Sequence, residues 1–129
     1  MVAANLTQLF GTLITASHIL HFHGVLDAYG HLSVRNPNNA STFFMSRNEA
    51  PALMASASDI VEYHISDASP VELNAPRGFI ERYIHSEIFK RFSAINSVIP
   101  VSIATTSLSY QFFSGLNAFT NPYRLQAVP

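Results

Sequence analysis

The stretch that decides the fold reads Glu81-Arg82-Tyr83-Ile84-His85-Ser86-Glu87-Ile88-Phe89-Lys90-Arg91-Phe92, followed shortly by Ile95-Asn96-Ser97-Val98-Ile99. Apolar side chains recur at helical spacing in the first part, which predicts a helix over 79–92. The second part is short, apolar and rich in β-branched residues, which predicts a strand entering a core. Glu81 and His85 stand one helical turn apart, on one side of this helix. The pair allows two interpretations, a general acid/base position beside a buried strand or a Glu–His pair in solvent.

The composition is that of an ordinary globular protein. The chain has 129 residues, of which 48% are hydrophobic and 12% charged, so it can form one domain with a modest core. Its net charge of −1, without a basic cluster, excludes an electrostatic surface for nucleic acid. No apolar run is long enough to cross a membrane, and the absence of cysteine suits a reducing compartment. We therefore expect a cytoplasmic protein with neither nucleic acid nor membrane as a partner.

The rest of the chain supplies elements for the predicted helix to cover. Amphipathic periodicity predicts another helix over 3–23, and alternation predicts strands over 31–35, 42–45 and 60–65. The first two strands should form a hairpin, because only a polar loop separates them. Histidines 18, 21 and 23 end the first helix and offer an alternative metal site, although helical spacing aligns only two of them.

Several blocks of sequence, taken in order, resemble the class II aldolase/adducin domain family in its adducin-like and decarboxylase-like branch. These blocks are Tyr29-Gly30-His31-Leu32-Ser33-Val34-Arg35-Asn36-Pro37, then 43–47 with 57–61, then 81–89, and finally 95–99. The resemblance covers roughly residues 5–99. It implies an α/β fold, here a partial α/β/α layered domain around a mixed, largely antiparallel sheet.

The resemblance also implies a chemistry. Family enzymes hold Zn²⁺ or a similar divalent ion through three histidines and cleave carbon–carbon bonds by aldol cleavage or decarboxylation. They act on small-molecule substrates and commonly form homo-oligomers, with the active site between subunits. The lyase function expected for this chain acts on a small oxygenated carbonyl or carboxylate substrate.

Carried onto this sequence, the resemblance assigns particular residues. Glu81 matches the catalytic acid/base, and Ser33, Ser46 and Arg47 match the region that holds the anionic end of the substrate. A surface position is an equally good interpretation of Arg47. The histidine of the hairpin, His31, is more simply explained by hydrogen bonds to its own turn than by ligand binding.

The residues before Glu81 bear on the substrate. A sugar-phosphate aldolase would carry Pro-Ser-Ser immediately before the catalytic Glu, and the sequence has Gly78-Phe79-Ile80 instead. Apolar side chains at these positions favour an uncharged or aromatic substrate over a phosphate. The sequence does not separate aldol cleavage from decarboxylation.

The chain departs from the family where the metal ligands belong. The His-x-His positions of the family strand fall on Pro100 and Ser102, and no histidine follows His85 in this sequence. The resemblance is therefore expected to stop at Pro100, leaving 1–129 as one incomplete domain with an atypical tail over 100–129. A truncated gene model, a frameshift or a splice product would explain such a break.

Two functions remain open at this point. As written, the chain should bind no metal at the family site and should show little or no catalysis, because proline offers no donor and a serine hydroxyl is a poor one. The alternative is a non-catalytic, adducin-like module for self-association or partner docking. The retained Glu81 favours descent from an enzyme.

Overall fold

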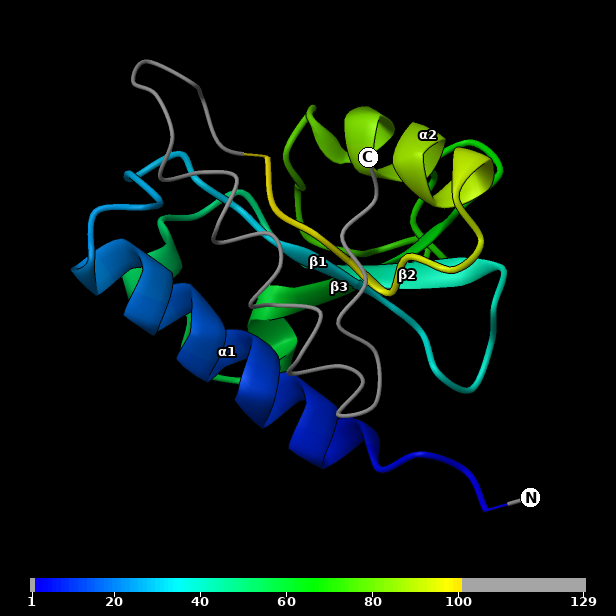
Figure 1. The fold of residues 1–129 in the computed structure, drawn as a ribbon, viewed down its shortest axis with the longest axis horizontal. Helices are drawn as coiled ribbons and strands as arrows, with labels where there is room; N and C mark the ends of the chain where they lie inside the picture. Colours follow the sequence, from blue (N-terminus) through cyan, green and yellow to red (C-terminus); the bar gives the residue numbers. More distant parts are fainter. Residues whose placement is uncertain (1, 101–129) are drawn as a thin grey trace.

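The computed structural model describes residues 2–100 and arranges them as two helices around one sheet (Figure 1). The helices and strands, with two short 3₁₀ helices, are α1 (Leu6–Phe22), β1 (Ser33–Arg35), β2 (Thr42–Ser46), η1 (Pro51–Leu53), η2 (Ala57–Asp59), β3 (Ile60–His64), α2 (Arg82–Arg91) and β4 (Ser97–Val98). Each predicted helix and strand is present, with ends that differ by a few residues. The predicted tail from 101 onward lies outside the described residues.

The sheet has four strands in the order β3-β2-β1-β4, and each neighbouring pair is antiparallel. The predicted hairpin is confirmed, because β1 pairs with β2 from Ser33 opposite Met45 to Arg35 opposite Phe43. Asn36 fixes its turn: the side-chain amide donates to Thr42 Oγ1 at 3.1 Å and to a Glu62 carboxylate oxygen at 2.9 Å.

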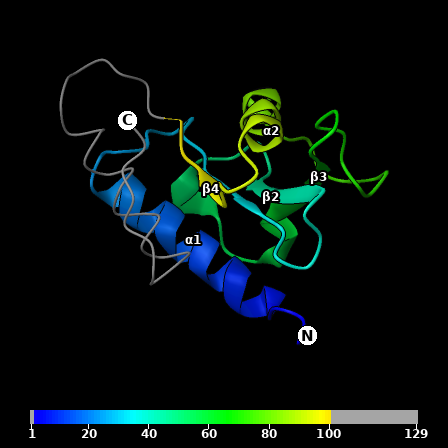
Figure 2. The same ribbon diagram turned by 45° about the vertical axis from the view of Figure 1, so that its right-hand side comes forward.

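The two faces of the sheet carry separate cores. Phe44, like Val34 and Leu32, packs with buried leucines of α1. Its neighbours Phe43 and Met45 point the other way and pack with Phe89 of α2, because successive side chains of a strand alternate between faces. The views show α1 and α2 on opposite sides of the sheet (Figures 1 and 2). The expected α/β/α layering is therefore present.

α1 begins and ends with recognisable signals. The Asn5 side chain accepts a hydrogen bond from the Gln8 backbone N–H at 3.2 Å and caps the helix. Leu13, Ser17 and Leu20 are buried on one face, as the periodicity predicted. The helix stops before Gly24, whose positive φ of 68° suits glycine. No helix in the described part of the chain is both long and apolar enough to cross a membrane.

α2 begins later than predicted, at Arg82 instead of residue 79. The preceding residues run alongside the end of β2: Arg47 pairs with Gly78, and the Asn48 N–H donates to the Arg77 carbonyl at 2.8 Å. This pairing keeps residues 77 and 78 extended, so the helix starts only after a turn that buries Phe79. It also fixes the position of Glu81 at the N-terminal end of α2.

Candidate functional site

The predicted site residues gather at one end of the sheet. Ser33 begins β1 opposite Met45 of β2, and Ser46 is the next residue of β2. Arg47 follows and pairs with Gly78, three residues before Glu81. Strand register and this single bridge thus bring positions 33, 46, 47 and 81 to the same end of the sheet.

Glu81 lies at the rim of a hollow of about 650 Å³ at this end of the sheet. The carboxylate is on an exposed residue, so it is open to a ligand. The hollow combines aromatic and apolar side chains with two arginines and an amide, and its lining includes Tyr29, Asn48, Arg77, Phe79, Ile80 and Tyr83. A carboxylate beside such a surface can exchange a proton with a planar, partly apolar ligand.

Beneath the hollow lies a buried chain of three polar side chains. Ser33 Oγ is 2.5 Å from Nδ1 of His85, and Nε2 of His85 is 2.9 Å from Nδ1 of His31. Ser33 and His85 are fully buried and His31 nearly so. The three residues come from β1, from α2 and from the segment just before β1. We call them the Ser33–His85–His31 chain.

Burial keeps both imidazoles neutral. Desolvation, with a smaller electrostatic contribution from the neighbouring His31 imidazole, lowers the pKa of His85 to about 3. Desolvation also lowers the pKa of His31, opposed by the negative charges of Glu81 and then Asp27. At neutral pH each ring therefore has one N–H donor and one acceptor nitrogen.

Two expectations about histidines are wrong. The Glu81–His85 pair is not a solvated pair, because only Glu81 is exposed while His85 points into the core. His31 bonds to His85 across the layers and not to its own turn. The sequence held a signal for the burial of His85: it precedes Phe89, the buried centre of the helix face, by one turn.

Arg47 is placed by two carboxylates. Its guanidinium is 2.9 Å from Glu49 Oε2 and 3.1 Å from Asp59 Oδ1, and 45% of its side chain is exposed. Asp59 also accepts the backbone N–H groups of Ala55 and Ser56, and these bonds, together with Arg47, lower its pKa. Arg47 is therefore a partly exposed residue, as a surface position requires, and its two ion pairs hold it near the predicted site. Its contact with a substrate stays a prediction.

The described residues do not fit the metal ion of the family. Pro100 has no side-chain donor, and no group of three or more His, Asp or Glu side chains in residues 2–100 could hold an ion. His31 and His85 use ring nitrogens on each other. Ser102, the other family position, lies outside the described residues. At the alternative site, His18 Nε2 and His21 Nδ1 lie at 2.8 and 3.2 Å from backbone carbonyl oxygens.

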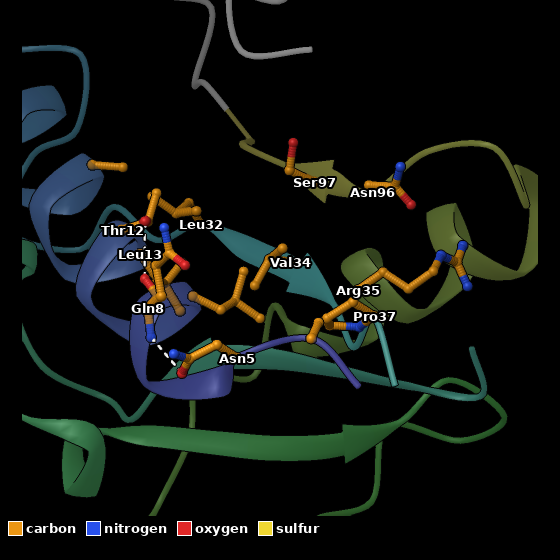
Figure 3. Close-up of a pocket in the computed structure, with 13 residues that line it drawn as sticks. Asn5, Gln8, Thr12, Leu13, Leu32, Val34, Arg35, Pro37, Asn96 and Ser97 are labelled. Atoms are coloured by element: carbon orange, nitrogen blue, oxygen red, sulfur yellow. Dashed lines mark hydrogen bonds between the residues drawn. The ribbon is translucent and has the colours of Figure 1, made fainter. Parts of the chain in front are cut away.

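A second hollow, a groove of about 440 Å³, runs between the N-terminal half of α1 and strands β1 and β4 (Figure 3). Leu9, Leu13, Leu32 and Val34 give it an apolar lining, and Arg35 is its one charged residue among those described. It offers no proton donor or acceptor of suitable pKa for acid/base chemistry. The hollow beside Glu81 is the candidate active site.

Comparison with known proteins agrees with this architecture. The model of the family described as Class II Aldolase and Adducin N-terminal domain matches residues 11–121. Decarboxylase tropJ of Talaromyces stipitatus is 55% identical over 106 residues, which are 82% of this chain and 39% of that protein. The family match continues past Pro100, so the expectation that the resemblance stops there is wrong.

Solved structures show the same fold at low sequence identity. An L-fuculose 1-phosphate aldolase from Glaciozyma antarctica PI12 superposes with a TM-score of 0.63 at 23% identity, over 85% of this chain and 44% of that one. An aldolase II superfamily protein from Pseudomonas syringae gives 0.67 at 20% identity, over 80% and 42%. This chain thus spans less than half the length of these relatives. It belongs to the class II aldolase and adducin family.

Proposed function

We propose that the chain supplies the acid/base part of a carbon–carbon lyase, of the decarboxylase type, acting on a small oxygenated carboxylate. One observation carries the proposal: the exposed carboxylate of Glu81 lies at the rim of a hollow lined by Phe79, Ile80 and Tyr83. The similarity to decarboxylase tropJ supports decarboxylation over aldol cleavage.

The hollow suits a planar ring carrying an anionic group. Phe79 is buried and Ile80 exposed, so together they offer an apolar surface near the acid. Arg77 lines the same hollow and supplies a cation for a carboxylate or phenolate. Glu81 would then deliver a proton to the carbon that loses CO₂, a role worth roughly 10²–10⁴-fold in rate.

The metal ion of the family would add Lewis-acid stabilisation of developing negative charge. Pro100 offers no side-chain donor for such an ion, and residues 2–100 hold no alternative ligand set. We expect the 129-residue chain to take up no stoichiometric Zn²⁺ and to turn over little or no substrate. Metal analysis of the purified chain after dialysis against Zn²⁺ tests this, and one ion per chain would contradict it.

Ligand binding tests the proposal without needing turnover. Titration of the full chain with 2,4-dihydroxybenzoate, followed by amide NMR, should shift resonances between residues 77 and 83. Arg77→Gln should weaken binding at least fivefold, because the cation facing the carboxylate is lost. The matched control is Arg91→Gln, which removes an exposed arginine at the opposite end of α2 and should leave the affinity unchanged.

A phosphate ligand provides the opposing outcome. Dihydroxyacetone phosphate, the type of ligand that a sugar-phosphate aldolase recognises, should bind at least tenfold more weakly than the aromatic carboxylate. Equal or tighter binding of the phosphate would contradict the substrate class. Shifts confined to the groove beside α1 would show that the site has been misplaced.

Self-association and partner docking stay predictions of the alternative, adducin-like function. One surface favours them: α2 exposes Tyr83, Ile84 and Phe92, each about half accessible, on its outer side. Light scattering of the full chain at several concentrations tests this. A monomer with an unchanged mass at high concentration would count against self-association.

A further inference from the structure

We propose that residues 108–112 of this chain form a fifth strand on the open edge of β4 and cover the apolar groove beside α1. The occupant of the groove is then a segment of the same molecule, from beyond the part of the chain that the structure describes. The inference is independent of the chemistry proposed for Glu81.

The two edges of the sheet differ. At the β3 edge the chain folds back on itself: Pro70 forms a bridge with Tyr63, and the Val71 N–H donates to the Glu62 carbonyl at 2.9 Å. At the other edge, no strand among residues 2–100 pairs with the outer side of β4. Proteins normally cover such an edge, because its free N–H and C=O groups can pair with another chain. The β4 edge is therefore the place for a further strand.

The hydrogen bonds of β4 show which of its groups point outward. The Arg35 N–H donates to the Asn96 carbonyl at 2.8 Å, so the backbone groups of Asn96 face β1. In an antiparallel ladder, successive residues direct these groups to alternate sides of the strand. Ser97 therefore directs its N–H and C=O to the open edge, where a partner strand can bond to both.

The apolar groove begins at this edge. The Ser97 side chain lines it, and Leu32 and Val34 lie between Ser97 and α1 (Figure 3). The one charged lining residue among those described, Arg35, already donates to backbone carbonyls through Nε and both terminal nitrogens. The groove therefore suits an apolar, uncharged cover and has no free charge to attract an ionic ligand.

The sequence that follows β4 has these properties. Residues 101–123 contain no charged side chain, and within them Leu108, Tyr110 and Phe112 alternate with polar residues. Alternation with period two is typical of a strand that buries one face. The family match runs to residue 121 and thus includes this segment in the domain.

The direction of the Ser97 side chain limits the register of the added strand. Residues directly opposite each other on antiparallel strands share a face, so an apolar side chain must lie opposite Ser97 to cover the groove. Tyr110 in that position centres the three apolar side chains on β4, places Leu108 opposite Ile99, and leaves residues 100–107 as the connection. A short tether gives an effective concentration of roughly millimolar, which favours this segment over a second copy of the chain.

Paramagnetic relaxation in the full chain tests the proposal. The sequence has no cysteine, so Gln8→Cys carries a single spin label at the exposed lip of the groove. We expect this label to reduce the amide signals of residues 108–112 at least twofold. Glu87→Cys, an exposed position on α2 across the sheet, is the matched label and should reduce the same signals far less. A Gln8 label without effect on residues 108–112 overturns the proposal.

Isotope mixing separates the tethered segment from a second copy. Spin-labelled chain at natural isotope abundance is mixed with unlabelled chain enriched in ¹⁵N, so that only contacts between molecules reduce the signals. We expect no reduction at residues 108–112 in the mixture. A reduction as large as in the singly labelled sample would show that another copy occupies the groove, and would overturn the assignment to the same molecule.

Paired variants test which face of the segment is buried. Tyr110→Asp with Phe112→Asp should abolish the effect of the Gln8 label and speed amide exchange at Ser97 at least tenfold, because the acceptor on the open edge is lost. Ser109→Asp with Gln111→Asp adds the same charge to the opposite face and should change neither readout. Equal effects of the two pairs, or fast exchange at Ser97 in the parent chain, would contradict the fifth strand.

Discussion

The guanidinium of Arg35 lies over the ring of Phe89, 4.8 Å from its centroid, and its Nη2 donates to the Phe89 carbonyl at 2.9 Å. The same side chain donates through Nε to the Ile95 carbonyl at 3.1 Å. A residue of β1 thus binds both the C-terminal end of α2 and the segment leading to β4. Unpaired carbonyls and the helix dipole make that end a favourable place for a cation.

Replacing Arg35 by alanine should lower the free energy of unfolding by about 2–3 kcal/mol, because charge-assisted bonds to several carbonyls are lost together. Urea unfolding followed by circular dichroism measures the change. Arg91→Ala, which removes an exposed arginine near the same helix end, should stay within about 0.5 kcal/mol of the parent chain. Equal losses in both variants would mean that α2 is sensitive to any lost cation.

Acid should destabilise the chain through its buried histidines. The pKa of His85 is about 3 in the folded state, below the ordinary histidine value of 6.5. Stability from the neutral ring is therefore complete above pH 6.5 and is lost as the pH falls from there toward 3, since the unfolded state binds the proton first. One such group changes the unfolding free energy by about 1.4 kcal/mol per pH unit inside this window.

Urea unfolding at several pH values between 7.5 and 5 measures this slope. His85→Gln should remove most of it, even though the variant is less stable at pH 7.5. His23→Gln, at the exposed end of α1, should keep the slope of the parent chain. A parent chain whose stability is flat between pH 7 and pH 5 would contradict the neutral, buried assignment of His85.

The Asp59 carboxylate should act in a lower pH window. Backbone bonds from Ala55 and Ser56 and the charge of Arg47 hold its folded pKa below the ordinary aspartate value. The ionised carboxylate contributes to the free energy of unfolding above the pKa of the unfolded state, which is near 4. This contribution is lost as the pH falls through the pKa of the folded state. Asp59→Asn should cost about 1–2 kcal/mol at pH 7, and the gap to the parent chain should narrow below pH 4. Glu72→Gln, at an exposed position, should leave unfolding unchanged.

Periodicity predicted the helices and strands, because the burial of one face of an element leaves a regular apolar spacing in the sequence. The helix–sheet–helix order itself came from the resemblance, and the structure shows its basis: Phe43 and Phe44 point to opposite faces of the sheet, and a helix covers each face. The gathering of Ser33, Ser46 and Glu81 came from the resemblance. The predicted hairpin is consistent with Ser33 and Ser46 at the same end of the sheet, but the position of Glu81 beside them depends on the Arg47–Gly78 bridge.

The Ser33–His85–His31 chain could not be predicted in the same way. Helical spacing grouped His85 with Glu81, yet the helix begins only at Arg82, which turns Glu81 outward while His85 faces inward. That start depends on the Arg47–Gly78 bridge, a contact between residues 31 positions apart. Long-range pairing of this kind leaves no periodic trace in a single sequence.

Tyr63 and Gly78 give the sharpest stability prediction. The Tyr63 hydroxyl is buried and finds no hydrogen-bond partner among residues 2–100, and a Cβ added at Gly78 would overlap it. Gly78→Ala should therefore lower the free energy of unfolding by about 1–3 kcal/mol through overpacking. Gly11→Ala is the matched control: nothing lies within 4 Å of its added Cβ, so this helix-interior change should stabilise by about 0.5–1 kcal/mol.

Removing the hydroxyl separates the clash from other effects of the alanine. Tyr63→Phe should raise the unfolding free energy by about 1 kcal/mol or leave it unchanged, since an unsatisfied buried group disappears. In the double variant, Tyr63→Phe should recover most of the loss caused by Gly78→Ala, and urea unfolding of all four chains gives the coupling energy. A coupling near zero would show that Gly78 is required for its backbone conformation beside Arg47. A destabilised Tyr63→Phe would instead show that the hydroxyl has a partner, and the space above Gly78 would then be polar.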